Sequence, residues 1–102
     1  MLFIARFEDR PAAQHLRVAN QAAHDGYVEA HKTHILVSGP LRRDDLGNPV
    51  GGLWYINADN RTAAERLCHE APFWTAGPWD KVTLMCQQAP THVYANMRIA
   101  CL

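Results

Sequence analysis

The apolar residues alternate between short strand-like segments and two stretches with helical spacing. Residues 2–8 (LFIARFE) carry bulky groups on both faces, which predicts a central β-strand. Asp9 is expected to cap a helix that has Pro11 in its first turn and extends to about Lys32. Its apolar residues recur at three- and four-residue steps, as in an amphipathic helix: Leu16, Ala19, Ala23, Tyr27 and Ala30.

Three further segments predict β-strands: His34–Ser38, Leu53–Ala58 and Lys81–Gln87. The first is expected to stop at Gly39-Pro40, because proline removes a hydrogen-bond donor. Between the other two, Asp59 is expected to cap a second helix, which Ala71-Pro72 ends.

The resulting order, β-α-β-β-α-β, predicts an α+β, ferredoxin-like fold with one antiparallel sheet. Helices would cover one face of the sheet, and the other face also carries apolar residues. An uncovered apolar face predicts a two-fold homodimer that packs sheet to sheet. We expect residues 1–88 to form this domain and residues 89–102 to be a C-terminal extension, as a further strand or a dimer arm.

Composition narrows the class of protein. The 102 residues suit one domain, and ten basic residues balance ten acidic ones. A net charge of zero argues against binding to nucleic acid or an anionic membrane. No apolar run approaches the ~18 residues of a membrane span, and the N-terminus lacks signal-peptide features. Three dispersed cysteines without a CxxC pair suggest reduced thiols in a cytoplasmic protein.

Arg17, His24 and His31 lie seven residues apart, nearly two helical turns, and therefore share one helix face. His24 is a candidate base in a cleft, or else a helix histidine satisfied by solvent. Arg17 would orient an anionic substrate through its planar guanidinium, or else pair with an acidic neighbour. His31 lies near the expected end of the helix. We expect no metal site, because His31 and His34 are separated by a break in structure.

Several segments, in order and spacing, resemble the YciI-like (YCII-related) family of dimeric α+β barrel proteins. They are LFIARFEDRP, RVANQAAH, HDGYVEAH, ILVSGPL, DDLGNPVG and APFWTAGPWDKVTL. The resemblance extends from Met1 to about Gln88 and implies a ferredoxin-like barrel half, a homodimer and a small-molecule cleft without a cofactor. It places the family's histidine at His24 and its helix arginine at Arg17.

The chain departs from the family pattern at the partner of this histidine. An aspartate of an Asp-Pro-aromatic motif pairs with the histidine in the family, and Ala71 stands at its position. A carboxylate beside an imidazole orients the ring and raises its pKa, so its loss weakens the expected base. Glu70 is the candidate substitute, although one residue of shift rotates a helical side chain by about 100°. Gly52 and Gln21 replace a serine and a second arginine of the family.

Aromatic residues are the remaining candidates for the cleft. With Arg17 as the anion partner, Tyr27, Phe73 and Trp74 are the expected substrate-binding residues. The alternative is that these rings belong to the core or to dimer contacts.

Three functional hypotheses follow. The first is a cofactor-free isomerase or lyase in which His24 moves a proton on a small anionic or aromatic substrate, as in the elimination of HX. The second is a non-catalytic small-molecule-binding or accessory protein, which the alanine at position 71 favours. The third is a structural subunit that acts only through its interface.

Overall fold

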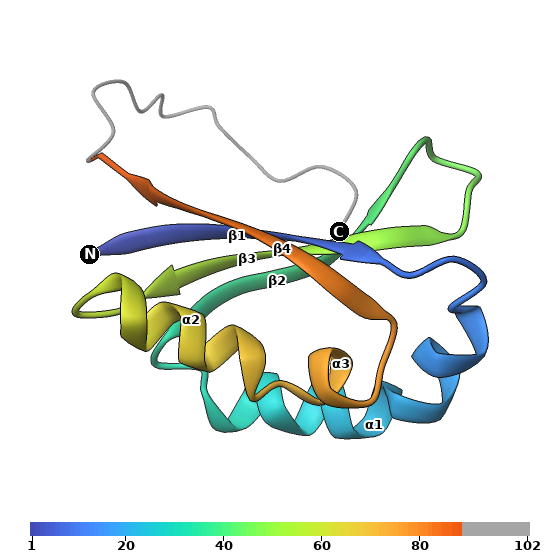
Figure 1. Cartoon of the computed structure of the whole chain (residues 1–102), viewed down its shortest axis with the longest axis horizontal. Helices are drawn as coiled ribbons and strands as arrows, with labels where there is room; N and C mark the ends of the chain where they lie inside the picture. The colour runs from blue at the N-terminus through green and yellow to red at the C-terminus, as the bar shows by residue number, and fades with distance from the viewer. Residues whose placement is uncertain (89–102) are drawn as a thin grey trace.

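The computed structural model describes residues 1–88 and forms one antiparallel sheet with helices on one side (Figure 1). Its elements are β1 (Leu2–Asp9), α1 (Gln14–Ala30), β2 (Ile35–Arg42), β3 (Pro49–Asn57), α2 (Arg61–His69), α3 (Pro72–Thr75) and β4 (Trp79–Gln87). The predicted β-α-β-β-α-β order is confirmed, with α3 as an added short helix. The predicted extension, residues 89–102, lies outside the described residues.

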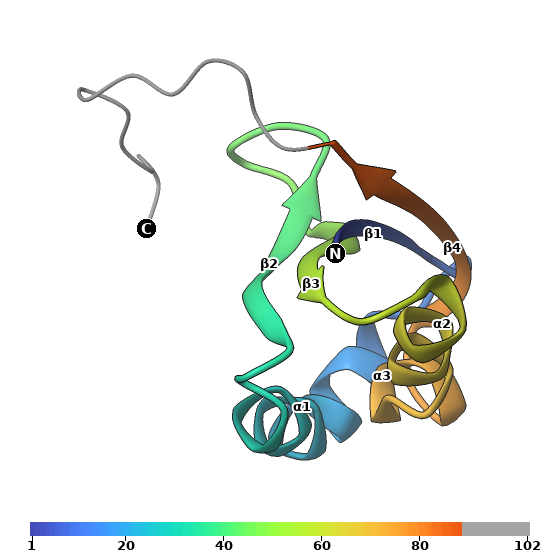
Figure 2. The ribbon, with the colours of Figure 1, turned by 90° about the vertical axis from the view of Figure 1, so that its left-hand side faces the viewer.

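The strands lie in the order β2-β3-β1-β4, so β1 is central, as its apolar character on both faces predicted. All three helices cover the same face (Figure 2). On that face alternate residues of β1 are buried, namely Phe3, Ala5 and Phe7. Trp54 and Ile56 of β3 complete the centre of the core. The fold is the predicted ferredoxin-like α+β arrangement.

Both predicted helix caps are wrong. Helix α1 begins at Gln14 after Ala13, which makes no capping side-chain bond, while Asp9 ends β1 and accepts hydrogen bonds from Arg17. The cap of α2 is Asn60, whose Oδ1 accepts from the Ala63 N–H at 2.8 Å, rather than Asp59. The residue at which a helix begins depends on local backbone geometry. Neighbouring Asp and Asn residues are also nearly equivalent as caps, so the sequence does not distinguish them.

Two strands extend beyond their predicted ends. Strand β2 continues through Gly39-Pro40 to Arg42, because it lies at the sheet edge, where a missing N–H costs no ladder hydrogen bond. Strand β3 begins at Pro49, before the predicted start at Leu53. Helix α1 continues through Gly26 and ends at Ala30, so His31 lies just after its last turn, as expected.

The sheet face away from the helices carries an apolar row across all four strands. In the strand register Val37 lies opposite Tyr55, Tyr55 opposite Ile4, and Ile4 opposite Met85. Val37 and Met85 are 40% and 64% exposed in the single chain. We call these four residues the outer row.

Two further features of the described residues are the state of the cysteines and the hydropathy of the helices. Cys68 is buried and Cys86 is exposed, and both are free thiols; Cys101 lies outside the described residues. Within residues 1–88 no helix is long and apolar enough to cross a membrane.

Candidate functional site

A cleft with a volume of about 430 Å³ lies between α1, the β2–β3 edge of the sheet and α3. Helix α1 lines it with Gln14, Arg17, Val18, Gln21, His24 and Asp25. The opposite wall consists of Ser38, Gly39, Pro40, Pro49, Gly51, Gly52, Phe73 and Trp79. The cleft therefore brings together segments from five elements around the face of α1 that carries Arg17 and His24.

The His24 imidazole is held between aromatic rings. It stacks on Phe73, with ring centroids 3.9 Å apart and an angle of 10° between the planes. Trp79 meets it edge to face, at 5.4 Å and 85°. His24 is only 8% exposed, and its Nδ1 atom is enclosed without a hydrogen-bond partner in the described part of the chain. Aromatic packing, rather than a carboxylate, thus orients this ring.

The same environment determines the charge of His24. Burial is the main effect and lowers the pKa of the imidazole from its ordinary value, because a charged ring loses hydration. The nearby Asp25 carboxylate opposes this shift, and the Arg17 cation adds to it. His24 is therefore neutral at pH 7 and has a free lone pair, as a proton acceptor requires.

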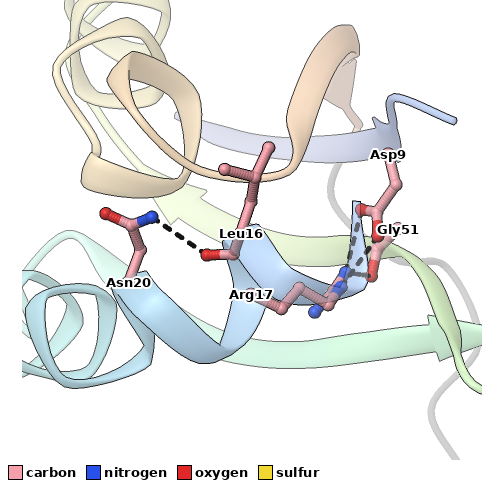
Figure 3. A network of polar contacts seen from close by, with 5 residues as sticks. All are labelled: Asp9, Leu16, Arg17, Asn20 and Gly51. Atoms are coloured by element: carbon pink, nitrogen blue, oxygen red, sulfur yellow. Dashed lines mark hydrogen bonds and ion pairs between the residues drawn. The ribbon is translucent and has the colours of Figure 1, made fainter. Parts of the chain in front are cut away.

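Arg17 is engaged by the protein itself (Figure 3). Its Nε and Nη2 atoms donate to the two carboxylate oxygens of Asp9 at 2.8 and 2.9 Å. Nη2 also donates to the Gly51 carbonyl oxygen at 2.8 Å. The expected alternative, an ion pair with an acidic neighbour, is present, and it is buried rather than at the surface. Asp9 balances the charge of Arg17, so the cleft wall presents a hydrogen-bond donor without a net positive charge.

Asn20 ties α1 to the segment that carries Phe73. Its Nδ2 donates to the Leu16 carbonyl oxygen at 2.9 Å (Figure 3) and to the Ala76 carbonyl oxygen at 3.1 Å. Ala76 directly follows α3. This bridge supports the stack of Phe73 on His24.

Gly52 makes room for Trp79. A Cβ atom at Gly52 would lie 2.7 Å from Cζ2 of the indole, well inside van der Waals contact. The indole also stacks on Phe7, with ring centroids 3.7 Å apart and an angle of 9° between the planes. Trp79 thus packs on a core ring and occupies space that the missing side chain of Gly52 leaves open.

The other predicted site residues lie apart from the cleft lining. The Tyr27 hydroxyl donates to the Leu67 carbonyl oxygen at 2.6 Å, and burial raises its pKa to about 12. Trp74 lies against His69, 4.8 Å between centroids. Glu70 is exposed at the end of α2, and within residues 1–88 no carboxylate hydrogen-bonds to His24.

Two residues outside the predicted set contribute to the site: Asp25 lines the cleft, and Asp9 lies behind it as the partner of Arg17. Trp79, one of several aromatic residues expected near the cleft, also lines it. Asp25 lies at the rim, where its Oδ1 accepts from the Gln21 amide at 2.9 Å. Residues 73 and 74 lie about 100° apart on the short helix α3, so only one of them faces the cleft, and it is Phe73. If a helix is assumed over these residues, this rotation predicts that Phe73 and Trp74 cannot both face the cleft. No sequence signal identified Asp9 as the partner of Arg17.

A second hollow, of about 560 Å³, lies beside the β1–α1 turn and the β2–β3 loop. It contains several charged side chains, among them Arg6, Glu8, Arg10 and Arg43. Within residues 1–88 there is no cluster of three or more His, Cys, Asp or Glu side chains arranged for a metal ion.

Comparisons with known proteins agree with this fold. No curated protein matches the chain. A solved structure that is similar to it is a 5-chloro-2-hydroxyhydroquinone dehydrochlorinase from Burkholderia phenoliruptrix in complex with 2,5-dihydroxybenzoquinone. It is 27% identical, with a TM-score of 0.77, and the match covers 86% of this chain and 94% of that one. The model of the YCII-related domain matches residues 1–87. The chain therefore belongs to the YCII-related family.

Proposed function

We propose that the cleft binds a small, planar ring compound and that His24 accepts a proton from it in a lyase- or isomerase-type reaction. The observation that carries this proposal is the flat stack of His24 on Phe73 in the cleft wall. The two parallel, stacked rings, with Trp79 at nearly right angles to both, form an aromatic corner, which suits another flat ring. The similar dehydrochlorinase, which was solved with a quinone, supports this ligand class.

The proposed reaction is the loss of HX from a halogenated, hydroxylated ring. In the keto tautomer of such a ring the halogen is bonded to a tetrahedral carbon. His24 takes the proton of a ring hydroxyl, the O–H electron pair forms a C=O bond, and the ring π electrons shift to expel the halide with the C–X bonding pair. The ring becomes a quinone with the loss of HX, so the step requires neither an oxidant nor a reductant. Because Nδ1 is enclosed, we assign the role of proton acceptor to Nε2. Arg17, held by Asp9, would offer a hydrogen-bond donor to a ring oxygen rather than a net charge to an anion.

The test is chloride release from a chlorinated hydroxyhydroquinone by the wild type, His24→Gln and His15→Gln. His15 lies on the same helix but is exposed, so its variant controls for the loss of an imidazole from α1. We expect His24→Gln to lower the rate by about 10²-fold or more, as is typical for the loss of a general base. An unchanged rate in His24→Gln would overturn the catalytic role.

The second candidate function is binding without catalysis. It is favoured by the position of Nδ1, which no carboxylate contacts within residues 1–88. Such a protein would bind hydroxylated rings and release no chloride. A calorimetric titration with hydroquinone therefore separates the two candidates when no turnover is found: binding supports this function, and no binding contradicts both.

We also propose that two copies associate through the outer row, in the cytoplasm. The row is apolar across four strands, and its two end residues, Val37 and Met85, are exposed in the single chain. The free thiols of Cys68 and Cys86 suit a reducing compartment.

A further inference from the structure

Two rings of the cleft wall each carry an enclosed nitrogen atom without a protein partner. They are Nδ1 of His24 and Nε1 of Trp79, and both residues line the cleft. A third such atom, Nε1 of Trp54, belongs to a ring that does not line it. Within residues 1–88 neither atom has a hydrogen-bond partner, and both residues are at least nine-tenths buried: Trp79 is 2% exposed and His24 is 8% exposed.

An unpartnered indole N–H is unusual in a folded interior. Buried tryptophans normally find an acceptor for this group, because leaving it unpaired forfeits the hydrogen bond it would make with water. Indole nitrogen is a donor only, so the missing partner must be an acceptor atom. The indole N–H of Trp79, in the wall of the cleft, is therefore available to donate a hydrogen bond to a ligand.

Three neighbouring residues define the position of the Trp79 ring. Phe7 supports one face of the indole, Phe73 meets it edge to face at 5.2 Å, and Gly52 leaves the space that the ring occupies. A side chain at position 52 would displace the ring, since even its Cβ would lie 2.7 Å from Cζ2. Contacts with Phe7 and Phe73, and the missing side chain at Gly52, thus define the orientation of the indole.

We propose that Trp79 is a specificity-determining residue whose indole N–H donates a hydrogen bond to an oxygen atom on the ligand ring. The cleft would then select rings that carry a carbonyl or phenolic oxygen over hydrocarbon rings of the same shape. This inference rests on the proposed function, because it concerns the same cleft. Nε1 is enclosed in this structure, so the contact requires the cleft wall to shift as the ligand enters.

The first experiment uses the intact chain and two probes of matched shape, hydroquinone and p-xylene, in which methyl groups replace the hydroxyl groups. The chain has three tryptophans, Trp54, Trp74 and Trp79, so its indole N–H signals in an ¹⁵N-¹H NMR spectrum are few and separable. We expect hydroquinone to move the Trp79 signal downfield, as a new hydrogen bond does, and p-xylene to leave it without that shift.

The second experiment compares two variants that remove the same chemical group. Trp79→Phe deletes the proposed donor, and Trp54→Phe deletes an equally enclosed indole N–H that does not line the cleft. We expect Trp79→Phe to weaken hydroquinone binding about tenfold, the typical effect of one hydrogen bond, and Trp54→Phe to leave it unchanged. Binding of p-xylene should be the same in both.

The outcomes separate this inference from the proposed function. If hydroquinone binds beside His24 and the Trp79 signal does not shift, the role of Trp79 is wrong and the cleft assignment stands. Equal hydroquinone affinities in the two variants lead to the same conclusion. If neither probe binds up to its solubility limit, both proposals fail. The NMR measurement needs no variant, so it decides the matter even if Trp79→Phe does not fold.

Discussion

Arg17 and His24 share one face of α1, but their surroundings differ: Arg17 is paired with a carboxylate and His24 is enclosed by aromatic rings. Arg17 remains charged in a buried position because Asp9 and the Gly51 carbonyl accept its hydrogen bonds. Nδ1 of His24 has no such partner within residues 1–88, and burial lowers the pKa of the ring, which favours the neutral form. Their seven-residue spacing predicted a shared face correctly. It contained no information about Asp9, whose side chain reaches Arg17 only after β1 and α1 have packed together.

The lowered pKa of His24 predicts a pH dependence of stability. Below about pH 6.5, its ordinary pKa, the unfolded chain binds a proton that the folded chain resists. The free energy of unfolding should therefore fall as the pH decreases from 6.5 toward the lowered folded pKa. The wild type should lose stability in this range relative to His24→Gln, measured by urea denaturation at several pH values.

His15→Gln is the matched control for this titration, because His15 is exposed on the same helix. The free energy of unfolding of the His15→Gln variant should depend on pH in the same way as that of the wild type. A wild-type curve parallel to that of His24→Gln would mean that burial does not disfavour the charged form of His24.

At the scale of elements, the site depends on how closely β3 approaches its neighbours. Gly51 and Gly52 lie where β3 passes β1 and Trp79, and a Cβ at Gly51 would overlap the Phe7 carbonyl oxygen. The order and type of the elements were predictable because apolar periodicity repeats over many residues in each of them. The exact ends of β2 and β3 were not, because Pro40 is tolerated only through the edge position of β2, which is a property of the assembled sheet.

Substitution of Gly52 tests this close approach. Gly52→Ala should destabilise the fold by about 1–3 kcal/mol, the usual cost of overpacking, because the Trp79 indole must move. Gly39→Ala is the control: it lies on β2, and a Cβ there meets nothing within 4 Å. Urea denaturation of both variants measures the difference. Equal stabilities would show that Trp79 does not depend on the missing side chain at position 52.

At the scale of the whole molecule, the helices leave one sheet face uncovered (Figure 2). The outer row crosses that face from Val37 to Met85. The sequence predicted both the layer of helices and an apolar second face, because strands that are apolar on both sides need cover on both sides. Which atoms line the cleft was a harder problem, since the aromatic residues after α2 differ only in the direction that one short helix gives them.

The proposed dimer predicts the effect of charge on the outer row. A double variant, Val37→Lys with Met85→Lys, should be monomeric by light scattering at concentrations where the wild type is a dimer, because burying two charges against the partner is costly. Leu46→Lys is the control, since Leu46 is 92% exposed in the loop between β2 and β3. A double variant that keeps the mass of the wild type would locate the interface elsewhere.

A crystal structure with hydroquinone would show whether the cleft beside His24 is the ligand site. We expect density for a flat ring against His24 and Phe73, with one oxygen atom within hydrogen-bond distance of Trp79 Nε1. Density in the charged hollow beside Arg6 and Arg10, with the His24 cleft unchanged, would place the ligand site elsewhere and overturn the role of His24.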